Sequence, residues 1–233
     1  MPRDLTNEEI KANSFPIGEA KLKEIKGLFE LGCFKRVPRA SCRNIIDARW
    51  VITWKLIDGV VAIKCRLTAR GFKDKMQELE TYAGTTSRYG QRIVNAIAAE
   101  HEDFVLFSFD VSQAFAKGMT FKELSELTGT ELREVQFDIP QADVDILKAI
   151  KGFEGYDPRS EILYMIKPIY GLKDAPRAWR KKLHQVLIGW LQTRQLYAEP
   201  ELYCTHASEG KYSALPPNEA EALQPECDPR AGD

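Results

Sequence analysis

The carboxylate of Asp110 follows an apolar run at residues 104–109, Phe-Val-Leu-Phe-Ser-Phe. The run predicts a short buried strand that ends at Asp110. A carboxylate at the end of a buried strand is held rigidly enough to serve as a metal ligand. The same pattern also fits an aspartate that caps a helix or a turn. This segment alone leaves both interpretations open.

A row of cations, Lys64, Arg66 and Arg70, is the second candidate for chemistry. The surrounding residues predict a strand, and side chains two positions apart lie on the same face of a strand. Three aligned cations suit a triphosphate or a nucleic-acid backbone. The alternative is the polar outer face of an ordinary antiparallel hairpin.

The charge of the chain is nearly balanced in total but unevenly distributed. The 233 residues carry 33 Lys and Arg against 34 Asp and Glu, a formal net charge of -1, which by itself argues against a nucleic-acid binder. However, residues 33–75 and 167–194 are basic, whereas residues 100–161 and those after 197 are acidic. The two basic blocks could form a cationic groove, or they could be solvated faces.

Several other classes of protein do not fit the sequence. The five cysteines show no C-x-x-C pair, which disfavours a zinc module and a disulfide scaffold and favours free thiols. The sequence has no apolar run long enough to span a membrane and no secretory signal, so we expect an intracellular protein, cytoplasmic or nuclear, that is not secreted. His101, His184 and His206 lack the spacing of metal ligands.

The elements that must position the candidate residues are a mixture of helices and strands, which predicts an α+β domain with an appended hairpin. We expect helices at 19–31, 89–100 and 121–128, strands at 45–57, 60–69, 104–109, 135–139 and 162–166, and a long helix from Asp174. The Asp58-Gly59 pair predicts the turn between the first two strands. Asp174 is the expected N-cap of the last helix, with Pro176 in its first turn.

Two segments resemble motifs of copia-type retrotransposon reverse transcriptases. Asp-Val-Ser-Gln-Ala-Phe-Ala-Lys-Gly at 110–118 resembles the first catalytic motif of the family. Lys-Pro-Ile-Tyr-Gly-Leu-Lys-Asp-Ala-Pro-Arg-Ala-Trp at 167–179 is similar to a later motif, with Asp174 in place of the usual Gln. Residues 36–38, 49–51 and 64–72 resemble the fingers region, and 199–203 resembles a further family segment. The matches follow the order of the family and cover residues 17–206.

The resemblance implies a right-hand polymerase fold of fingers and palm, and DNA synthesis on an RNA or DNA template. It implies that Asp110 and the Val111 carbonyl bind magnesium, and that Phe115 selects deoxynucleotides, although core packing is an alternative for Phe115. The expected partners are template-primer, deoxynucleotide triphosphates and the remainder of a retrotransposon polyprotein. The residues expected to bind the nucleotide are Lys55, Lys64, Arg66, Arg70, Phe115, Gly171 and Pro176, and those expected to bind nucleic acid are Lys173, Arg177 and Lys181.

One departure from the family concerns the second catalytic motif, Tyr-x-Asp-Asp. The sequence contains no Asp-Asp pair, and Asp143 and Asp145 are better placed to cap a helix. We therefore expect residues 1–16 to form an N-terminal arm, 17–206 a polymerase domain truncated before the second palm motif and the thumb, and 207–233 a disordered acidic tail. Magnesium, expected for a complete domain, should bind this chain weakly or not at all.

Three hypotheses remain at this stage. The chain is a reverse transcriptase region that is inactive in isolation, a non-catalytic remnant that retains a basic nucleic-acid-binding groove, or a relic that does not fold stably. Primer extension, salt-dependent binding of a duplex and cooperative unfolding distinguish the three.

Overall fold

The computed structural model describes residues 3–57, 59–76, 78–205, 207–208 and 211–212. The chain divides into two compact units, the first made of residues 1–81 and 113–179 and the second of residues 82–112 and 180–233. Of the expected disordered tail at 207–233, only residues 207–208 and 211–212 are among the described residues. Asp58 of the predicted turn lies outside them. No helix in the described part of the chain combines the length and the apolar character needed to cross a membrane.

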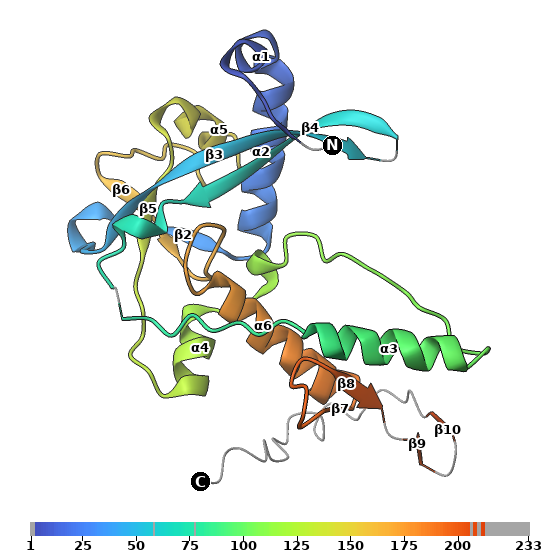
Figure 1. The fold of residues 1–233 in the computed structure, drawn as a ribbon. Coiled ribbons are helices and arrows are strands. Elements are labelled where there is room, and N and C mark those ends of the chain that lie inside the picture. The colour runs from blue at the N-terminus through green and yellow to red at the C-terminus, as the bar shows by residue number, and fades with distance from the viewer. Residues whose placement is uncertain (1–2, 58, 77, 206, 209–210, 213–233) are drawn as a thin grey trace. The chain divides into compact units, whose positions relative to one another are not determined.

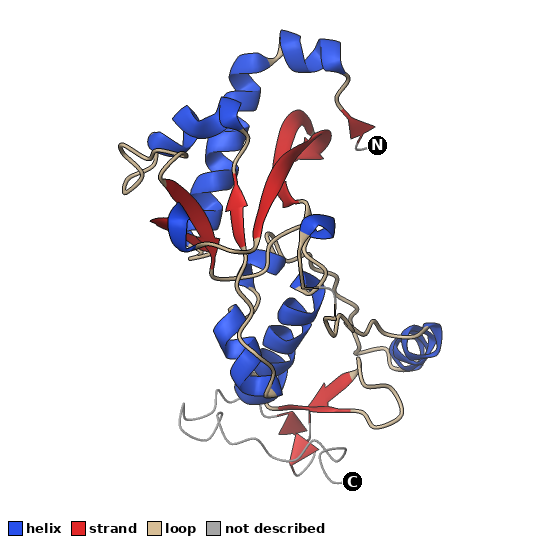
Figure 2. Ribbon diagram, turned by 90° about the vertical axis from the view of Figure 1, so that its left-hand side faces the viewer, coloured by secondary structure: helices blue, strands red, loops and turns tan. Residues whose placement is uncertain are grey.

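The first unit is built on a six-stranded mixed sheet (Figures 1 and 2). The long strand β3 (Ile45–Ile57) pairs antiparallel with β4 (Val60–Ala69) and β1 (Arg3–Asp4), and parallel with β5 (Gln136–Asp138). The sheet continues through β6 (Glu161–Met165) to β2 (Phe34–Pro38). Because Thr53 pairs with both Lys64 and Asp4, β4 and β1 lie on opposite sides of β3. The strand β4 is therefore an edge strand.

The helix α2 (Ser14–Glu30) packs against this sheet and closes its core. Its apolar residues Ile25 and Leu28 are buried with Leu67 and Ala69 of β4, as the predicted stripe on this helix requires. Gly32 adopts a φ of +67° just after the helix, which confirms it as the stop. The N-terminal residues join the same unit, since α1 (Asn7–Ala12) begins with a capping box at Thr6 and Leu5 is buried beside Ile17.

The remaining helices of the first unit are short. The helix α4 (Phe121–Thr128) has the predicted bounds, and α5 (Val144–Lys148) follows the 3-10 turn Gln141–Asp143. Further 3-10 turns span Arg39–Ser41, Gly71–Lys73 and Phe115–Lys117. The helix α6 (Ala175–Gln185) begins in the first unit and ends in the second.

The second unit contains α3 (Arg88–Glu100), the end of α6 and a π-helical turn at Val186–Trp190. Two small antiparallel pairs follow, β7 (Thr193–Gln195) with β8 (Tyr203–Thr205), and β9 (Ala207–Ser208) with β10 (Lys211–Tyr212). The carboxylate of Glu199 accepts hydrogen bonds from Ser87 at the start of α3, and Glu201 is paired with Arg180 of α6.

The prediction of a buried strand at residues 104–109 is wrong. The segment is irregular, and Phe107 and Phe109 are each 86% exposed. A strand needs a neighbour that accepts and donates its backbone hydrogen bonds, and no strand in the described part of the chain pairs with this one. The predicted helix α3 is confirmed, but its apolar residues Ile93, Val94 and Ile97 are exposed.

Candidate functional site

The cations of the hairpin β3–β4 share one face, as the sequence predicted. Along β4 the side chains of Cys65, Leu67 and Ala69 are buried, while Lys64 and Arg66, which alternate with Cys65 and Leu67, lie on the opposite face and are half-buried. On β3, Lys55 lies opposite Ala62, and Thr53 lies opposite Lys64. Since residues opposite each other in an antiparallel pair share a face, Lys55 belongs to the same cationic face as Lys64 and Arg66.

Arg70 does not continue this row. The strand ends at Ala69, and the Arg70 amide donates to the Asp47 carbonyl at the start of a 3-10 turn. Its guanidinium lies 3.0 Å from the Asp47 carboxylate, which also binds Lys73 at 2.8 Å. Burial opposes ionisation of Asp47, but its bond to Lys73 and the charge of Arg70 prevail and lower its pKa. Arg70 is thus held by a carboxylate beside the cationic face.

Phe115 and Tyr170 bring two distant motif segments together. Their ring centroids are 5.2 Å apart, and the Arg66 guanidinium carbon lies 6.0 Å from the centre of the Tyr170 ring. Phe115 also packs against the core of the first unit, so its expected role beside a sugar and the packing alternative remain compatible. The contact of Tyr170 with Phe115 was not predicted, although Tyr170 lies between Ile169 and Gly171 in the segment 167–179 that resembles a family motif.

Gly171 forms a tight turn against the free edge of β4. The Ala69 amide donates to the Tyr170 carbonyl at 2.8 Å, and Gly171 has a φ of +92°. A Cβ at this position would lie 2.0 Å from the Ala69 carbonyl oxygen. Here glycine is required both by the backbone conformation and by the space available. The turn therefore packs the backbone of the segment 167–179 against Ala69, on the edge strand β4 of the cationic hairpin.

The start of α6 carries the expected nucleic-acid-binding residues in different environments. Lys173 is exposed and Pro176 is half-buried, but Arg177 is only 6% exposed and its guanidinium is bonded to Glu80. Arg177 is thus buried and paired with a carboxylate, and its predicted binding of nucleic acid stays a prediction. Lys181, half-buried, lies in the part of α6 that belongs to the second unit.

Of the three aspartates predicted as helix caps, Asp145 lies in the first turn of α5, while Asp143 and Asp174 bind distant side chains instead. No side-chain cap bond is found for Asp143 at the start of α5; its carboxylate accepts from Trp50 Nε1 at 2.8 Å and from Lys21 at 2.6 Å. Asp174 is buried before α6 and is paired with Arg133, which also binds the buried Asp74. In each case a distant cation or indole competes for the carboxylate, which a local cap pattern does not reveal.

Asp110 and Val111 belong to the second unit, whereas the cationic hairpin belongs to the first. Asp110 is exposed and stands in an irregular segment. Among the described residues, no group of three or more His, Cys, Asp or Glu side chains is able to hold a metal ion. The residues present around Asp110 therefore do not fit a two-magnesium site, which requires several converging carboxylates.

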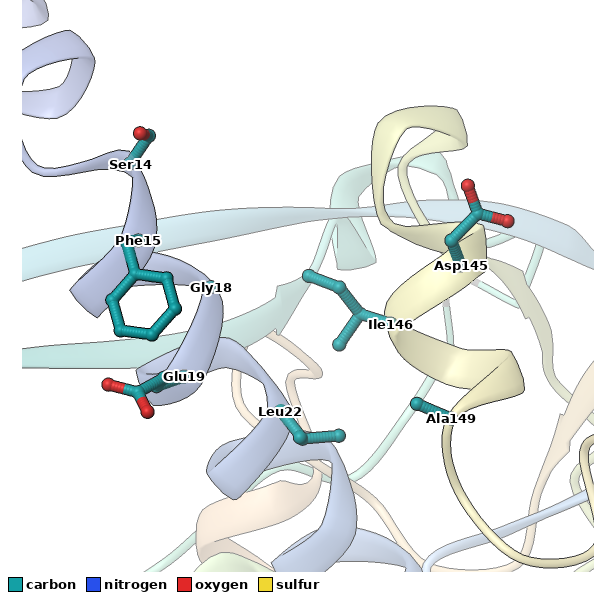
Figure 3. Close-up of a pocket in the computed structure, with 8 residues that line it drawn as sticks. All are labelled: Ser14, Phe15, Gly18, Glu19, Leu22, Asp145, Ile146 and Ala149. Carbon is teal, nitrogen blue, oxygen red and sulfur yellow. The ribbon is translucent and has the colours of Figure 1, made fainter.

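An open hollow of about 620 Å³ lies elsewhere on the first unit, between α2 and α5 (Figure 3). Phe15 and Leu22 line it from α2, and Ile146 lines it from α5. The charged side chains at this hollow are the carboxylates of Glu19 and Asp145. An apolar hollow with these acidic groups does not suit a triphosphate.

Comparison with known proteins connects the chain to retrotransposons. The retrovirus-related Pol polyprotein from transposon TNT 1-94 of Nicotiana tabacum is 26% identical over 204 residues, which is 84% of this chain and 13% of the polyprotein. The corresponding polyproteins from transposons RE2 and RE1 of Arabidopsis thaliana are 30% and 28% identical over 62% and 65% of the chain, each match covering 9% of the polyprotein. No protein-family model and no solved structure matches the chain.

These matches support a coarse assignment. The chain is similar to one region of retrotransposon Pol polyproteins, and it spans only 9 to 13% of the length of these relatives. The sequence predicts the remainder of a retrotransposon polyprotein as a partner, and these matches are consistent with that prediction.

Proposed function

We propose that this chain is part of the reverse transcriptase region of a copia-type retrotransposon, with a right-hand fingers–palm fold. One observation carries the proposal: three segments that resemble motifs of that family meet in the first unit. The cationic strand β4, the segment 113–118 and the segment 167–179 are joined by the contact between Phe115 and Tyr170 and by the Gly171 turn on Ala69. The similarity to Pol polyproteins supports the same proposal.

In this proposal the cationic face of the hairpin binds the triphosphate of a deoxynucleotide. Lys55, Lys64 and Arg66 provide three positive charges on one face, and Arg70 borders it. A guanidinium and ammonium groups offer charge-assisted hydrogen bonds to phosphate oxygens. The rings of Phe115 and Tyr170, beside Arg66, offer an apolar surface for the sugar. The exposed Lys173 and the half-buried Lys181 contact the template backbone.

In a complete polymerase, Asp110 and the Val111 carbonyl would be among the residues that hold magnesium, which would stabilise the charge that develops during nucleotidyl transfer. This chain supplies Asp110, but its 233 residues contain no Asp-Asp pair. The Asp-Asp pair of the second catalytic motif would then come from other polypeptide, and the isolated chain binds magnesium weakly or not at all. We expect it to hold nucleotide and template without catalysing incorporation.

Binding of a poly(rA)/oligo(dT) hybrid tests the nucleic-acid part of the proposal. The logarithm of the binding constant should fall linearly with the logarithm of the salt concentration, because phosphates that bind the protein release counterions. The double variant Lys173→Ala/Lys181→Ala should reduce the salt slope by about 2. Lys122→Ala, which removes an exposed lysine on α4, is the matched control and should leave the slope unchanged. Binding that does not depend on salt would contradict the proposal.

The second candidate is a non-catalytic remnant that binds nucleic acid. The exposed Asp110, without a converging carboxylate cluster among the described residues, favours it. Primer extension with magnesium separates the candidates when the chain is supplied with the missing polymerase segment in trans. Incorporation that is abolished by Asp110→Asn supports the reverse transcriptase, whereas hybrid binding without incorporation supports the remnant.

A further inference from the structure

Glu24 is a buried carboxylate on the face of α2 that packs against β4. It is 8% exposed and lies one position before Ile25 in the core-facing stripe of the helix. Its Oε1 accepts no hydrogen bond within the described part of the chain. Burial of a carboxylate in such a place is unfavourable, and it raises the pKa of Glu24. A hydrophobic residue would be the stabilising choice at this position.

The groups around Glu24 belong to the proposed nucleotide site. Its Oε2 accepts a hydrogen bond of 3.4 Å from the Gln113 side chain. Burial dominates and raises the pKa of Glu24, while the Gln113 side chain, the charges of Lys64 and Arg66 and the Leu67 amide partly oppose that rise. These charges are those of the cationic face, and the Leu67 amide lies on the same strand between them and the Gly171 turn.

Gln113 is held in a conformation that a non-glycine residue rarely adopts. Its φ is +54°, and it stands three residues after Asp110 and two before Phe115. Its side chain lies against Gly27, where a Cβ would approach Nε2 to 2.9 Å. Glu24 and Gly27 are three residues apart, so they share one face of α2 and together form a seat for Gln113. A residue with positive φ at such a place needs its surroundings to hold it.

We propose that Glu24 is a positioning residue of the nucleotide site: it fixes Gln113 on α2 and so holds Phe115 beside the cationic strand that carries Lys64 and Arg66. This inference rests on the proposed function, because the site that Glu24 positions is the proposed triphosphate site. Glu24 acts through Gln113 and through the charges on β4, without touching the nucleotide.

Binding of dTTP, followed by calorimetry, tests the inference in the full chain. Glu24→Leu should weaken binding about fivefold, the size expected for the loss of one buried hydrogen bond. The melting temperature should not fall, because the variant replaces a poorly satisfied buried carboxylate by an apolar side chain. Glu24→Gln keeps an acceptor for Gln113 and should bind dTTP within about twofold of the parent. Glu19→Gln, an acidic residue of the same helix outside this cluster, is the control.

A second pair of measurements keeps the test decisive if Glu24→Leu unfolds. Gln113→Ala removes the same hydrogen bond from its other end and should by itself weaken dTTP binding by a similar factor. Amide hydrogen exchange at residues 114–118 should accelerate in Gln113→Ala but not in Glu24→Gln.

The outcomes separate this inference from the proposed function. If Lys64→Ala/Arg66→Ala abolishes dTTP binding while Glu24→Leu and Gln113→Ala bind like the parent, only the positioning role is overturned. If Glu24→Gln loses as much affinity as Glu24→Leu, charge and not position is responsible, and the inference is again overturned. A parent chain that does not bind dTTP, or binds it equally well without Lys64 and Arg66, contradicts both.

Discussion

Arg133 lies between two buried carboxylates, and this cluster shows how a single residue connects distant segments. Its guanidinium pairs with Asp74 and Asp174 and lies 5.2 Å from the centre of the Phe121 ring. Asp74 also accepts from Asn44 at 2.9 Å and from the Met76 amide at 3.0 Å. The loop after β4, the approach to β5 and the start of α6 are thereby joined.

Replacing Arg133 by methionine should reduce the free energy of unfolding by about 3 to 5 kcal/mol. The substitution leaves two buried carboxylates without a cation, which costs more than the lost ion pairs are worth. Urea denaturation measures the change. Arg159→Met, at an exposed position, is the control and should change stability by less than about 0.5 kcal/mol.

The triple variant Arg133→Met/Asp74→Asn/Asp174→Asn should recover part of this loss, because it removes the uncompensated charges together with the cation. A single variant as stable as the parent would contradict the account of the cluster.

Two buried thiols should be inert at neutral and mildly alkaline pH. Burial raises the pKa of Cys33 and of Cys65 to about 11, so both remain protonated at pH 8, and the thiolate is the reactive form. Cys204 is exposed. Alkylation with iodoacetamide, followed by peptide mass spectrometry, should modify Cys204 first and Cys33 and Cys65 only after unfolding. Equal rates at the three sites would show that the first unit is not folded as described.

Residue types predicted which cations share a face of the hairpin, but they did not predict which side chains form ion pairs and hydrogen bonds around it. The alternation of Lys64 and Arg66 with Cys65 and Leu67 was sufficient to place the cations on one face, since strand geometry fixes it. The partners of Asp174, Asp143 and Arg177 could not be predicted, because each lies at least 41 residues away in the sequence. Only the assembled fold decides which distant charge reaches a buried carboxylate.

At the scale of elements, the Gly171 turn on β4 is the most constrained connection of the site. Gly171→Ala should destabilise the first unit by about 2 kcal/mol or more, since it adds both an unfavourable φ and a clash with the Ala69 carbonyl. Gly152→Ala is a matched control: Gly152 has a φ of +95°, but nothing lies within 4 Å of its Cβ position. It should cost about 1 to 2 kcal/mol.

Thermal unfolding of the two glycine variants measures the difference, which isolates the steric part of the effect. Gly171→Ala should also weaken dTTP binding, whereas Gly152→Ala should not. Equal destabilisation by the two substitutions would mean that the turn does not press against β4.

The elements of the first unit were largely predictable, while in the second unit the helix α3 was predicted correctly and the strand at 104–109 was not. The helices α2 and α4 and the hairpin β3–β4 carry strong periodic or turn signals and also find their partners nearby. The segment 104–109 has an equally strong strand pattern, yet it is irregular. A strand pattern in the sequence indicates which side chains a strand would bury. The segment forms a strand only when a neighbouring strand completes its backbone hydrogen bonds.

At the scale of the whole molecule, the exposed apolar groups of the second unit should promote self-association. Val105, Phe107 and Phe109 are exposed, as is the apolar side of α3. Exposed apolar surface and unpaired backbone favour contacts between copies. Light scattering at micromolar concentration should therefore show oligomers that diminish in Phe107→Lys/Phe109→Lys. Leu127→Lys, at an isolated exposed leucine, is the control, and a strictly monomeric parent would contradict this expectation.

The net charge of -1 is a property of the whole molecule, and it does not show how charge is distributed among the segments of the chain. The hairpin β3–β4 presents Lys55, Lys64 and Arg66 on one face, whereas the acidic residues after 212 lie outside the described structure. A sum over the chain therefore carries little information about what one face of one hairpin binds.

Photo-crosslinking of 5-iodo-dUTP tests the central claim most directly, namely that the first unit holds a deoxynucleotide between its cationic strand and the Phe115–Tyr170 pair. Mass spectrometry should locate the adduct on Phe115, Tyr170 or β4, with the signal suppressed by excess dTTP and lost in Lys64→Ala/Arg66→Ala. Adducts that are scattered over the chain, or that persist in the double variant, would contradict the account.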